Sequence, residues 1–473
     1  WLSNSSWAAL NNSGTLTITT TLYNYLHGTV NNTGTLNNNG TSYNWGTLTN
    51  SGAFNNAGTF INYSGGAITN QSGSSLTNSP GAILTNQAGA TLTNDSGAVF
   101  TNSGTFNNSG TFTNNGTFKG TGTMVGNFSN DGIVAPGNSI GTMTITGNYT
   151  HNTGATYLVE VNAAGQSDKL VVTGTAALNG GTVSVWAASG NYPNSTSTTY
   201  TILTAGSVTG TFAGITSDFA FMTAYLNYDP SHVYLTLARN STRFVDVAVT
   251  PNQAAVAAAL DRIGTGATGD MMTVMDNLLD LSAAGARSAF GQMGGLSHTA
   301  LAEASFSAFY RYIGTLTGRM DSFITTGLPS PVDTGFLLLS SRTDTGSDAG
   351  NMLLAAMENA RTSSVYHGGQ QKPDWGFWTR GYGSLGDRKG DDIASRYDYR
   401  NGGIALGFDR KISEGMLLGA SAGYSYTKVS MDGLPDSGKV TGYQGSIYGA
   451  WVPGSGYLNA LIAYGYNRYD NTR

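Results

Sequence analysis

The stretch "TNSGTFNNSGTFTNNGTF", Thr101–Phe118, decides the fold of the first part of the chain. Phe106, Phe112 and Phe118 follow one another at intervals of six residues, and a Gly precedes each of them by two positions. An amphipathic helix needs apolar residues at spacings of three and four, which this stretch does not supply. A short strand with inward side chains and a tight Gly/Asn corner fits, because Gly and Asn tolerate left-handed backbone. The stretch therefore predicts a repeating β-structure.

The same unit recurs upstream. In ten of eleven consecutive units an Asn follows the leading apolar residue by two positions, and the leading residues stand six or eight positions apart: Leu48, Phe54, Phe60, Ile68, Leu76, Leu84, Leu92, Phe100, Phe106, Phe112 and Phe118. Three units make a coil of 18 or 24 residues. This predicts a triangular solenoid with the apolar residues inside and the Asn side chains in hydrogen-bonded ladders at matching corners. Each coil contacts only its neighbours, so the stack needs capped ends.

The Asn and Thr residues of the repeat also allow two other interpretations. They could form a face that binds a sugar or a protein, or they could belong to a disordered linker. Disorder is disfavoured, because a polar linker does not keep Leu and Phe in phase. A binding face stays open beside the interpretation as corners and ladders.

Composition divides the chain into two parts. Charged residues make up 10% of the 473 residues, and Lys119 and Lys169 are the only cations before Arg239. The absence of Cys excludes disulfides and thiolate metal sites. The formal net charge of −5 gives no reason to expect a nucleic-acid partner.

After the repeat, two short motifs carry a family resemblance. "APGNSIG" at 135–141 and "SDKL" at 167–170 resemble the end of the passenger in autotransporters, the type V secretion proteins of Gram-negative outer membranes. "TPNQAAVAAALDRI" at 250–263 looks like the segment that follows that passenger. The resemblance implies a mostly β protein. We expect a right-handed parallel β-helix passenger over 1–130, a C-terminal cap or autochaperone-like region over 131–240, and an α-helical linker over 241–370.

From Trp375 the pattern changes to a period of two. Ile404, Leu406 and Phe408 share one face of a strand, whereas Gly403, Ala405, Gly407 and Asp409 share the other. Long strands with large apolar residues on one face and small or polar residues on the other are typical of a transmembrane barrel. Short turns at 413–415 and 453–456 predict the periplasmic side, and long charged connections at 384–397 and 427–439 predict the outer side.

Five such strands occur over 371–473, whereas the barrels of this family have twelve. We therefore expect an incomplete transmembrane antiparallel β-barrel and a sequence that is a fragment, cut at both ends. Strand one begins on the periplasmic side, so the preceding chain must cross the membrane inward through the lumen. A helix over 347–366 would be roughly 30 Å long, about the thickness of the hydrocarbon layer.

Candidate chemical motifs are few. Gly264–Gly269 matches G-x-G-x-x-G, but it follows a helical stretch rather than a strand. None of the five His residues lies in a motif with the spacing of metal ligands. They are His27, His151, His232, His298 and His367. Asp391 and Asp392 lie in a predicted outer loop and suit calcium or plain solvation. Arg380 belongs to no Arg-Gly-Asp motif, and Glu358-Asn359-Ala360 lacks the Asn-Asn pair at which some relatives are cleaved. We assign no catalytic, cofactor-binding or metal site and no cofactor.

The resemblance implies a barrel anchored in the outer membrane that displays the β-helix at the cell surface. We expect an adhesin or autoaggregation factor and not an enzyme. The alternative is the stalk and translocator of a secreted enzyme whose catalytic domain lies upstream of residue 1. In a third interpretation the repeats are only a spacer. The implied partners are outer-membrane lipid, the barrel-assembly machinery, periplasmic chaperones and ligands on host or bacterial surfaces.

Overall fold

The computed structural model describes residues 1–188, 190, 192, 197–327, 329, 332–340, 374–389, 396–431 and 437–472. They form two compact units, one comprising Trp1–Arg243 with Ile263–Ala286 and the other Phe244–Arg262 with Arg287–Arg473. The four domains expected from the sequence, with bounds at 130, 240 and 370, stay a prediction.

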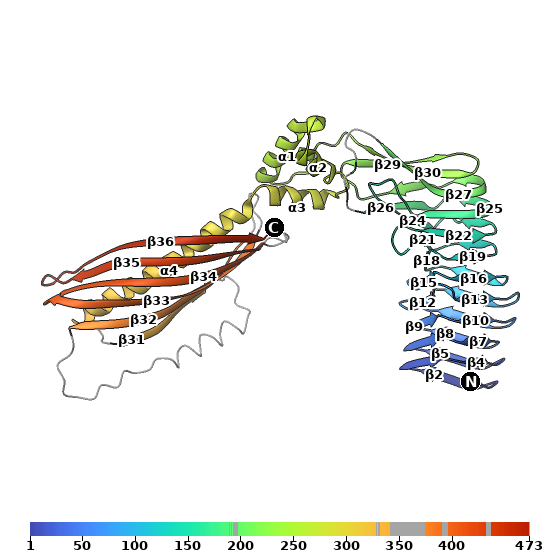
Figure 1. The fold of residues 1–473 in the computed structure, drawn as a ribbon, viewed down its shortest axis with the longest axis horizontal. Coiled ribbons are helices and arrows are strands. Elements are labelled where there is room, and N and C mark those ends of the chain that lie inside the picture. The colour runs from blue at the N-terminus through green and yellow to red at the C-terminus, as the bar shows by residue number, and fades with distance from the viewer. Residues whose placement is uncertain are drawn as a thin grey trace. The chain divides into compact units, whose positions relative to one another are not determined.

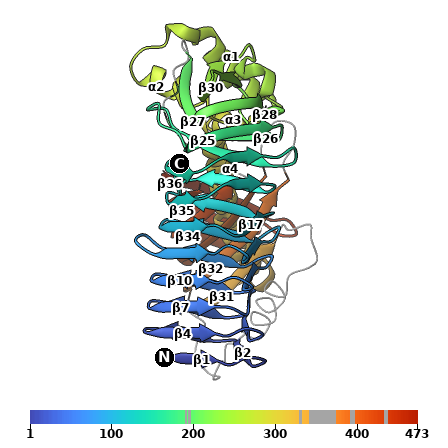
Figure 2. The same cartoon turned by 90° about the vertical axis from the view of Figure 1, so that its right-hand side faces the viewer.

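The first unit is built on a parallel β-solenoid with three strands per coil (Figures 1 and 2). The first column contains β1 (Leu2–Asn4), β4 (Thr21–Asn24), β7 (Thr41–Asn44), β10 (Thr59–Asn62), β13 (Ile83–Asn86), β16 (Thr105–Asn108), β19 (Thr123–Val125) and β22 (Thr142–Thr146). The second contains β2 (Ala9–Asn12), β5 (Thr29–Asn32), β8 (Thr47–Asn50), β11 (Ala67–Asn70), β14 (Thr91–Asn94), β17 (Thr111–Asn114), β20 (Phe128–Asn130) and β23 (Tyr149–His151). The third contains β3 (Thr15–Ile18), β6 (Thr35–Asn38), β9 (Ala53–Asn56), β12 (Ser75–Asn78), β15 (Val99–Asn102), β18 (Thr117–Gly120), β21 (Ile133–Pro136), β24 (Thr156–Val161), β26 (Thr182–Ala187) and β28 (Gly214–Thr216).

The leading apolar residues fill the solenoid core, as the repeat predicts. Phe106 and Phe118 are completely buried, and Phe112 is 8% exposed. The rings of Phe106 and Phe112 meet edge to face with their centroids 5.2 Å apart. Such aromatic pairs add to the free energy gained by burying the rings. The prediction that these three residues point inward is confirmed.

The Asn that follows each leading residue also points inward, because residues two apart on a strand lie on the same side. Asn62 and Asn86 are completely buried. Asn62 donates from Nδ2 to Oδ1 of Asn86 at 2.8 Å and to the carbonyl oxygen of Thr91 at 2.9 Å. The predicted ladders are therefore present: each Asn is the last residue of its strand, at the corner, and its side chain points into the coil. The ladder satisfies buried amides that would otherwise destabilise the fold.

Beyond the repeats the strands lengthen and close the stack. β25 (Lys169–Asn179) pairs with both β22 and β23, and β27 (Thr198–Thr211) pairs with β25. β29 (Met222–Tyr228) and β30 (His232–Arg239) then form an antiparallel hairpin, with β30 also antiparallel to β27. The change from parallel to antiparallel pairing ends the solenoid, which is what a cap requires.

Helices follow the cap along the chain. They are η1 (Phe244–Val247), α1 (Pro251–Ile263), η2 (Gly264–Gly266), α2 (Asp270–Asp276), α3 (Ala283–Met293) and α4 (Leu296–Thr326). None of the helices in the described part of the chain is long and apolar enough to cross a membrane.

The second unit contains an antiparallel sheet in chain order. Its strands are β32 (Trp375–Arg388), β33 (Tyr397–Ser413), β34 (Met416–Met431), β35 (Ser437–Trp451) and β36 (Leu458–Thr472). A further strand, β31 (Val332–Ser340), lies parallel to β32 and was not predicted. α4 runs along one face of this sheet (Figure 1). The helix expected over 347–366 lies outside the described residues and stays a prediction.

Candidate functional site

The two faces of the sheet β32–β36 differ as the period of two predicts. On one face, Ile404, Leu406 and Phe408 are about half exposed, at 48%, 45% and 51%. On the other face, Ala405 and Asp409 are completely buried beneath α4. We call this second face the inner face. The large apolar side chains of the outer face suit lipid, and the inner face suits a lumen.

α4 and the inner face share an apolar cluster along the length of the helix. Tyr312, Leu316 and Met320 of α4 pack there against Trp378 and Tyr448 of the sheet. A second cluster contains Leu301 and Ala304 of α4 with Tyr397, Met431 and Val440. The second cluster lies at the end of the strands that carries the long connections, whereas Asp321 accepts a hydrogen bond from Asn459 next to the short turn after β35. α4 therefore runs from the outer-loop end to the turn end of the sheet.

A buried ion pair joins α4 to β33. Arg319 Nε lies 2.8 Å from Asp409 Oδ2, and Nη2 lies 3.0 Å from Oδ1. Arg319 is 2% exposed and Asp409 is completely buried. Tyr448 OH donates to the same Oδ2 at 2.8 Å, and Trp378 Nε1 donates to Tyr448 OH at 2.6 Å. The carboxylate is thus held by three donors from α4 and β35, with Trp378 of β32 supporting the tyrosine.

Glycine clears the space for this network. Gly419 lies between Asp409 and Tyr448 in the register of β33, β34 and β35. A Cβ on Gly419 would approach Tyr448 Cζ to 2.5 Å and Asp409 Cβ to 2.8 Å. The missing side chain lets the Tyr448 ring cross β34 and reach the carboxylate.

Polar groups continue along the inner face. Tyr312 OH lies 2.6 Å from Ser421 Oγ and donates to Ser446 Oγ at 2.9 Å. Gln444 donates from Nε2 to Ser425 Oγ at 2.9 Å. The inner face is therefore a hydrogen-bonding surface that contacts the helix, as expected for a lumen rather than for a surface that contacts lipid.

In the cap, the structure joins the two motifs that carry the family resemblance. Asp168 accepts hydrogen bonds from the backbone N–H groups of Gly141 and Glu160, both at 2.9 Å. The Lys169 N–H donates in turn to the Gly141 carbonyl oxygen at 2.9 Å. Burial raises the pKa of the Asp168 carboxyl to about 7, although the two N–H groups act in the opposite direction. The two motifs therefore bind each other by hydrogen bonds and stabilise the same part of the cap.

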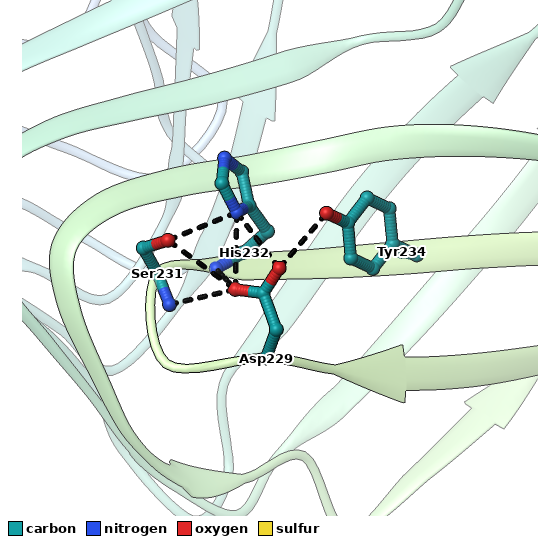
Figure 3. A network of polar contacts seen from close by, with 4 residues as sticks. All are labelled: Asp229, Ser231, His232 and Tyr234. Carbon is teal, nitrogen blue, oxygen red and sulfur yellow. Dashed lines mark hydrogen bonds and ion pairs between the residues drawn. The ribbon is translucent and has the colours of Figure 1, made fainter.

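The hairpin tip between β29 and β30 holds a Ser, a His and an Asp close together (Figure 3). Asp229 accepts from the N–H groups of Ser231 and His232 at 2.8 and 2.7 Å and from Tyr234 OH at 2.9 Å. These donors, the Ser231 N–H foremost, hold the pKa of the Asp229 carboxyl well below its usual range.

This cluster does not have the geometry of a hydrolytic triad. In such a triad the imidazole Nδ1 faces the carboxylate, and Nε2 faces the serine hydroxyl. Here Ser231 Oγ lies 3.0 Å from His232 Nδ1, the same nitrogen that lies 3.0 Å from both carboxylate oxygens of Asp229. The hydroxyl and the carboxylate share one nitrogen, so no proton relay from Ser through His to Asp is formed. The cluster stabilises a turn.

The other candidate motifs also have structural positions. Gly264–Gly266 forms η2 directly after α1, and Gly269 precedes α2, so no strand leads into the glycines. His27 stacks on Trp7 with ring centroids 4.2 Å apart. Asp391, Asp392, His367 and Glu358-Asn359-Ala360 lie outside the described residues. Among the described residues no group of three or more His, Cys, Asp or Glu is placed to hold a metal ion.

Comparison with known proteins identifies the family. Residues 377–473 match the family model of the autotransporter beta-domain. An extracellular serine protease of Serratia marcescens is 28% identical to this chain over 361 residues, which cover 73% of the chain and 34% of that protein. The chain carries an autotransporter beta-domain. A second extracellular serine protease of Serratia marcescens is 25% identical over 352 residues, covering 71% of the chain and 33% of that protein.

The match to the autotransporter beta-domain gives the two units their roles. The sheet β32–β36 is part of the translocator that anchors in the outer membrane, and the solenoid is the passenger at the cell surface or outside the cell. The chain spans about a third of the length of the curated relatives it matches. Both relatives are named as proteases, so the expectation that this autotransporter is not an enzyme is wrong.

Sequence reasoning missed the helix on the inner face. It expected an α-helical linker over 241–370, but it assigned the lumen to the later helix over 347–366. One signal was available: α4 carries Arg319 in a largely apolar stretch, and Asp409 is the one carboxylate among the small inward residues of its strand. A cation and an anion that both face inward predict a pair.

Proposed function

We propose that this autotransporter exports a serine protease, with the solenoid as the stalk and the sheet β32–β36 as part of the translocator. The observation that carries the proposal is the extent of the match to the two proteases. The family model covers residues 377–473 alone, so a match over 73% of the chain includes a large part of residues 1–376. The relationship therefore extends beyond the barrel, which many kinds of passenger share.

The catalytic residues are proposed to lie in a segment outside residues 1–473. The cluster at the hairpin tip has the residue types of a triad in Ser231, His232 and Asp229. Its hydrogen bonds stabilise a turn and do not form a catalytic relay. A solenoid with a Thr- and Asn-rich surface and few charges suits a stalk that holds a folded domain away from the membrane. We further propose that the barrel-assembly machinery and periplasmic chaperones bring the barrel into the outer membrane. The adhesin role stays a prediction.

The complete open reading frame provides the test. It should be expressed in a Gram-negative host, with casein hydrolysis measured in intact cells and in the medium. We expect hydrolysis that a sulfonyl fluoride inhibitor abolishes. An in-frame deletion of 47–110 removes the nine units β8 to β16, so each later strand keeps its column. It should shorten the stalk and leave hydrolysis in place, because the deletion removes no proposed catalytic residue. A full-length protein that reaches the surface without hydrolysing casein or other unfolded proteins would overturn the proposal.

A second measurement tests the display itself. Protease added to intact cells, at a dose that degrades the isolated folded solenoid, should degrade the repeats while sparing the barrel, because the solenoid lies outside the outer membrane. Repeats that stay protected until the outer membrane is permeabilised would contradict surface display.

A further inference from the structure

We propose that Arg319 and Asp409 form a register lock, the contact that fixes how far α4 slides outward through the translocator. Arg319 is a positioning residue in this proposal: it stops the helix at one height in the lumen and thereby ends the outward passage of the chain. The proposal goes beyond the exported activity and does not depend on whether the passenger is a protease.

The pair is better suited to setting a position than to adding stability. Burying two charges costs several kcal/mol per ion, and the mutual attraction offsets this cost only when geometry and hydrogen bonding are favourable. Here the guanidinium meets the carboxylate through two parallel contacts of 2.8 and 3.0 Å, a bidentate geometry that few other positions of the helix would preserve. The best-attested use of a buried polar pair is to select one register among several.

The carboxylate is held rigidly at one height of the inner face. Tyr448 reaches it from β35 across Gly419 of β34, and Trp378 of β32 holds the tyrosine hydroxyl at 2.6 Å. Trp378 is completely buried and Tyr448 is 1% exposed, so neither ring has freedom to follow a moving helix. Four strands thus fix the Asp409 carboxylate at one position in the lumen. The ion pair forms only when α4 is positioned so that Arg319 lies next to it.

Neighbouring registers of α4 offer this anion no cation. A slide by one helical turn replaces Arg319 with Phe323 or Thr315, both of which are uncharged. The nearest other cation on the helix is Arg311, two turns away. Because α4 runs from the outer-loop end to the turn end, an outward slide brings Phe323 to the carboxylate. That register separates the buried carboxylate from Arg319, and breaking a buried ion pair is strongly unfavourable.

The experiment reads the register by disulfide cross-linking in the full-length protein in outer membranes. The chain contains no Cys, so introduced pairs report without background. The Asp321→Cys/Asn459→Cys pair replaces two side chains that lie 3.1 Å apart and reports the native register. The Thr325→Cys/Asn459→Cys pair reports an outward slide of one turn. With Arg319 and Asp409 intact, we expect a high yield from the first pair and a low yield from the second.

Each Cys pair is then combined with Arg319→Met/Asp409→Leu, which replaces both charges with apolar groups of similar size. Such replacements leave stability almost unchanged or increase it, so the barrel should assemble. We expect the native-register yield to fall several-fold and the slid-register yield to rise. The swapped pair Arg319→Asp/Asp409→Arg should restore part of the native yield. An unchanged native-register yield in the apolar double variant would overturn the proposal, because packing alone would then fix the helix.

A second readout covers variants in which cross-linking itself fails. Barrel assembly is followed by the shift in gel mobility between heated and unheated samples. Assembly with loss of both cross-links supports the proposal, since the helix then has no fixed height. Loss of assembly in the apolar double variant contradicts the proposal, because the pair would then be needed for folding and not for register.

Discussion

His151 lies one coil beyond Asn130 in the register of β20 and β23, so an imidazole takes the next position of the second asparagine ladder. Its Nδ1 lies 2.7 Å from Tyr149 OH, and Phe212 packs edge-on with the ring centroids 5.0 Å apart. Burial lowers the pKa of His151 to about 4, with a backbone hydrogen bond at Ala155 acting in the opposite direction. The ladder therefore ends at a titratable group where the repeats meet the cap.

His151→Asn should remove part of the acid sensitivity of the cap. A His whose pKa is lowered on folding favours the folded state above its unfolded pKa of about 6.5 and loses that contribution as pH falls through about 4. The raised pKa of Asp168 has the opposite effect, because it favours the folded state at low pH. The wild type and the His151→Asn variant both contain Asp168, so its effect cancels in the comparison. The measurement is the urea midpoint at pH 7 and pH 5, followed by fluorescence. If the urea midpoint shifted equally between pH 7 and pH 5 in the wild type and in the variant, the role of His151 would be contradicted.

Phe112→Asp should unfold the coils around β17. The ring contacts Phe100, Phe106, Phe118 and Phe128, with centroids 5.2 to 5.8 Å apart, so a carboxylate there is buried among aromatic rings. Even Phe112→Ala should cost about 3–5 kcal/mol by leaving a cavity. The outward neighbour Thr113 provides the matched control as Thr113→Asp. Limited proteolysis should cleave the first variant within the repeats and leave the control intact; equal resistance of both would show that Phe112 does not point inward.

Asn70→Ala should break the second ladder at one coil. Asn70 accepts from Asn50 at 2.7 Å and from Ser74 Oγ at 2.7 Å, and it donates to Asn94 at 2.9 Å. Its removal takes the ladder donor from Oδ1 of Asn94 and one acceptor from Asn50, whose Nδ2 keeps the Ser75 carbonyl oxygen at 2.9 Å. A buried polar group that loses its partner costs about 1–3 kcal/mol. Hydrogen exchange should quicken in β8, β11 and β14 more than in the third column. Thr69→Ala on the outer side of the same strand is the control, and an equal effect there would argue against the ladder.

Gly403→Ala should slow assembly of the barrel, whereas Gly402→Ala should not. A Cβ on Gly403 would lie 2.5 Å from Tyr382 Cζ and 2.6 Å from the Tyr424 carbonyl oxygen, but a Cβ on Gly402 meets nothing within 4 Å. The first variant must displace a buried tyrosine or the neighbouring strand. Pulse-chase labelling measures how fast each variant forms the folded barrel, which is recognised by its heat-modifiable gel mobility. Similar assembly rates for the two variants would mean that Tyr382 moves aside without cost.

The elements that the sequence predicted are those whose pattern is local. Phe112 could be placed inside because alternation along a strand fixes its side. The Asn ladders were expected at the corners, and the same alternation explains why their side chains point inward. The outer position of Leu406 and the inner position of Asp409 follow from the same period of two. By contrast, the partner of Arg319 lies 90 residues away, and no local spacing joins them. The protease names of the relatives were not anticipated, because no motif recognised within residues 1–473 indicated that chemistry.

The three-strand coil has a consequence for how such a stalk can change length. Each strand stacks on the third strand before it, so a gain or loss of one six- or eight-residue unit moves every later strand to a neighbouring column. Asn side chains from different ladders would then be forced into one. Viable changes in length therefore come in whole triplets of units, each adding about 4.8 Å of height. The length of the solenoid therefore changes only in discrete steps of one coil.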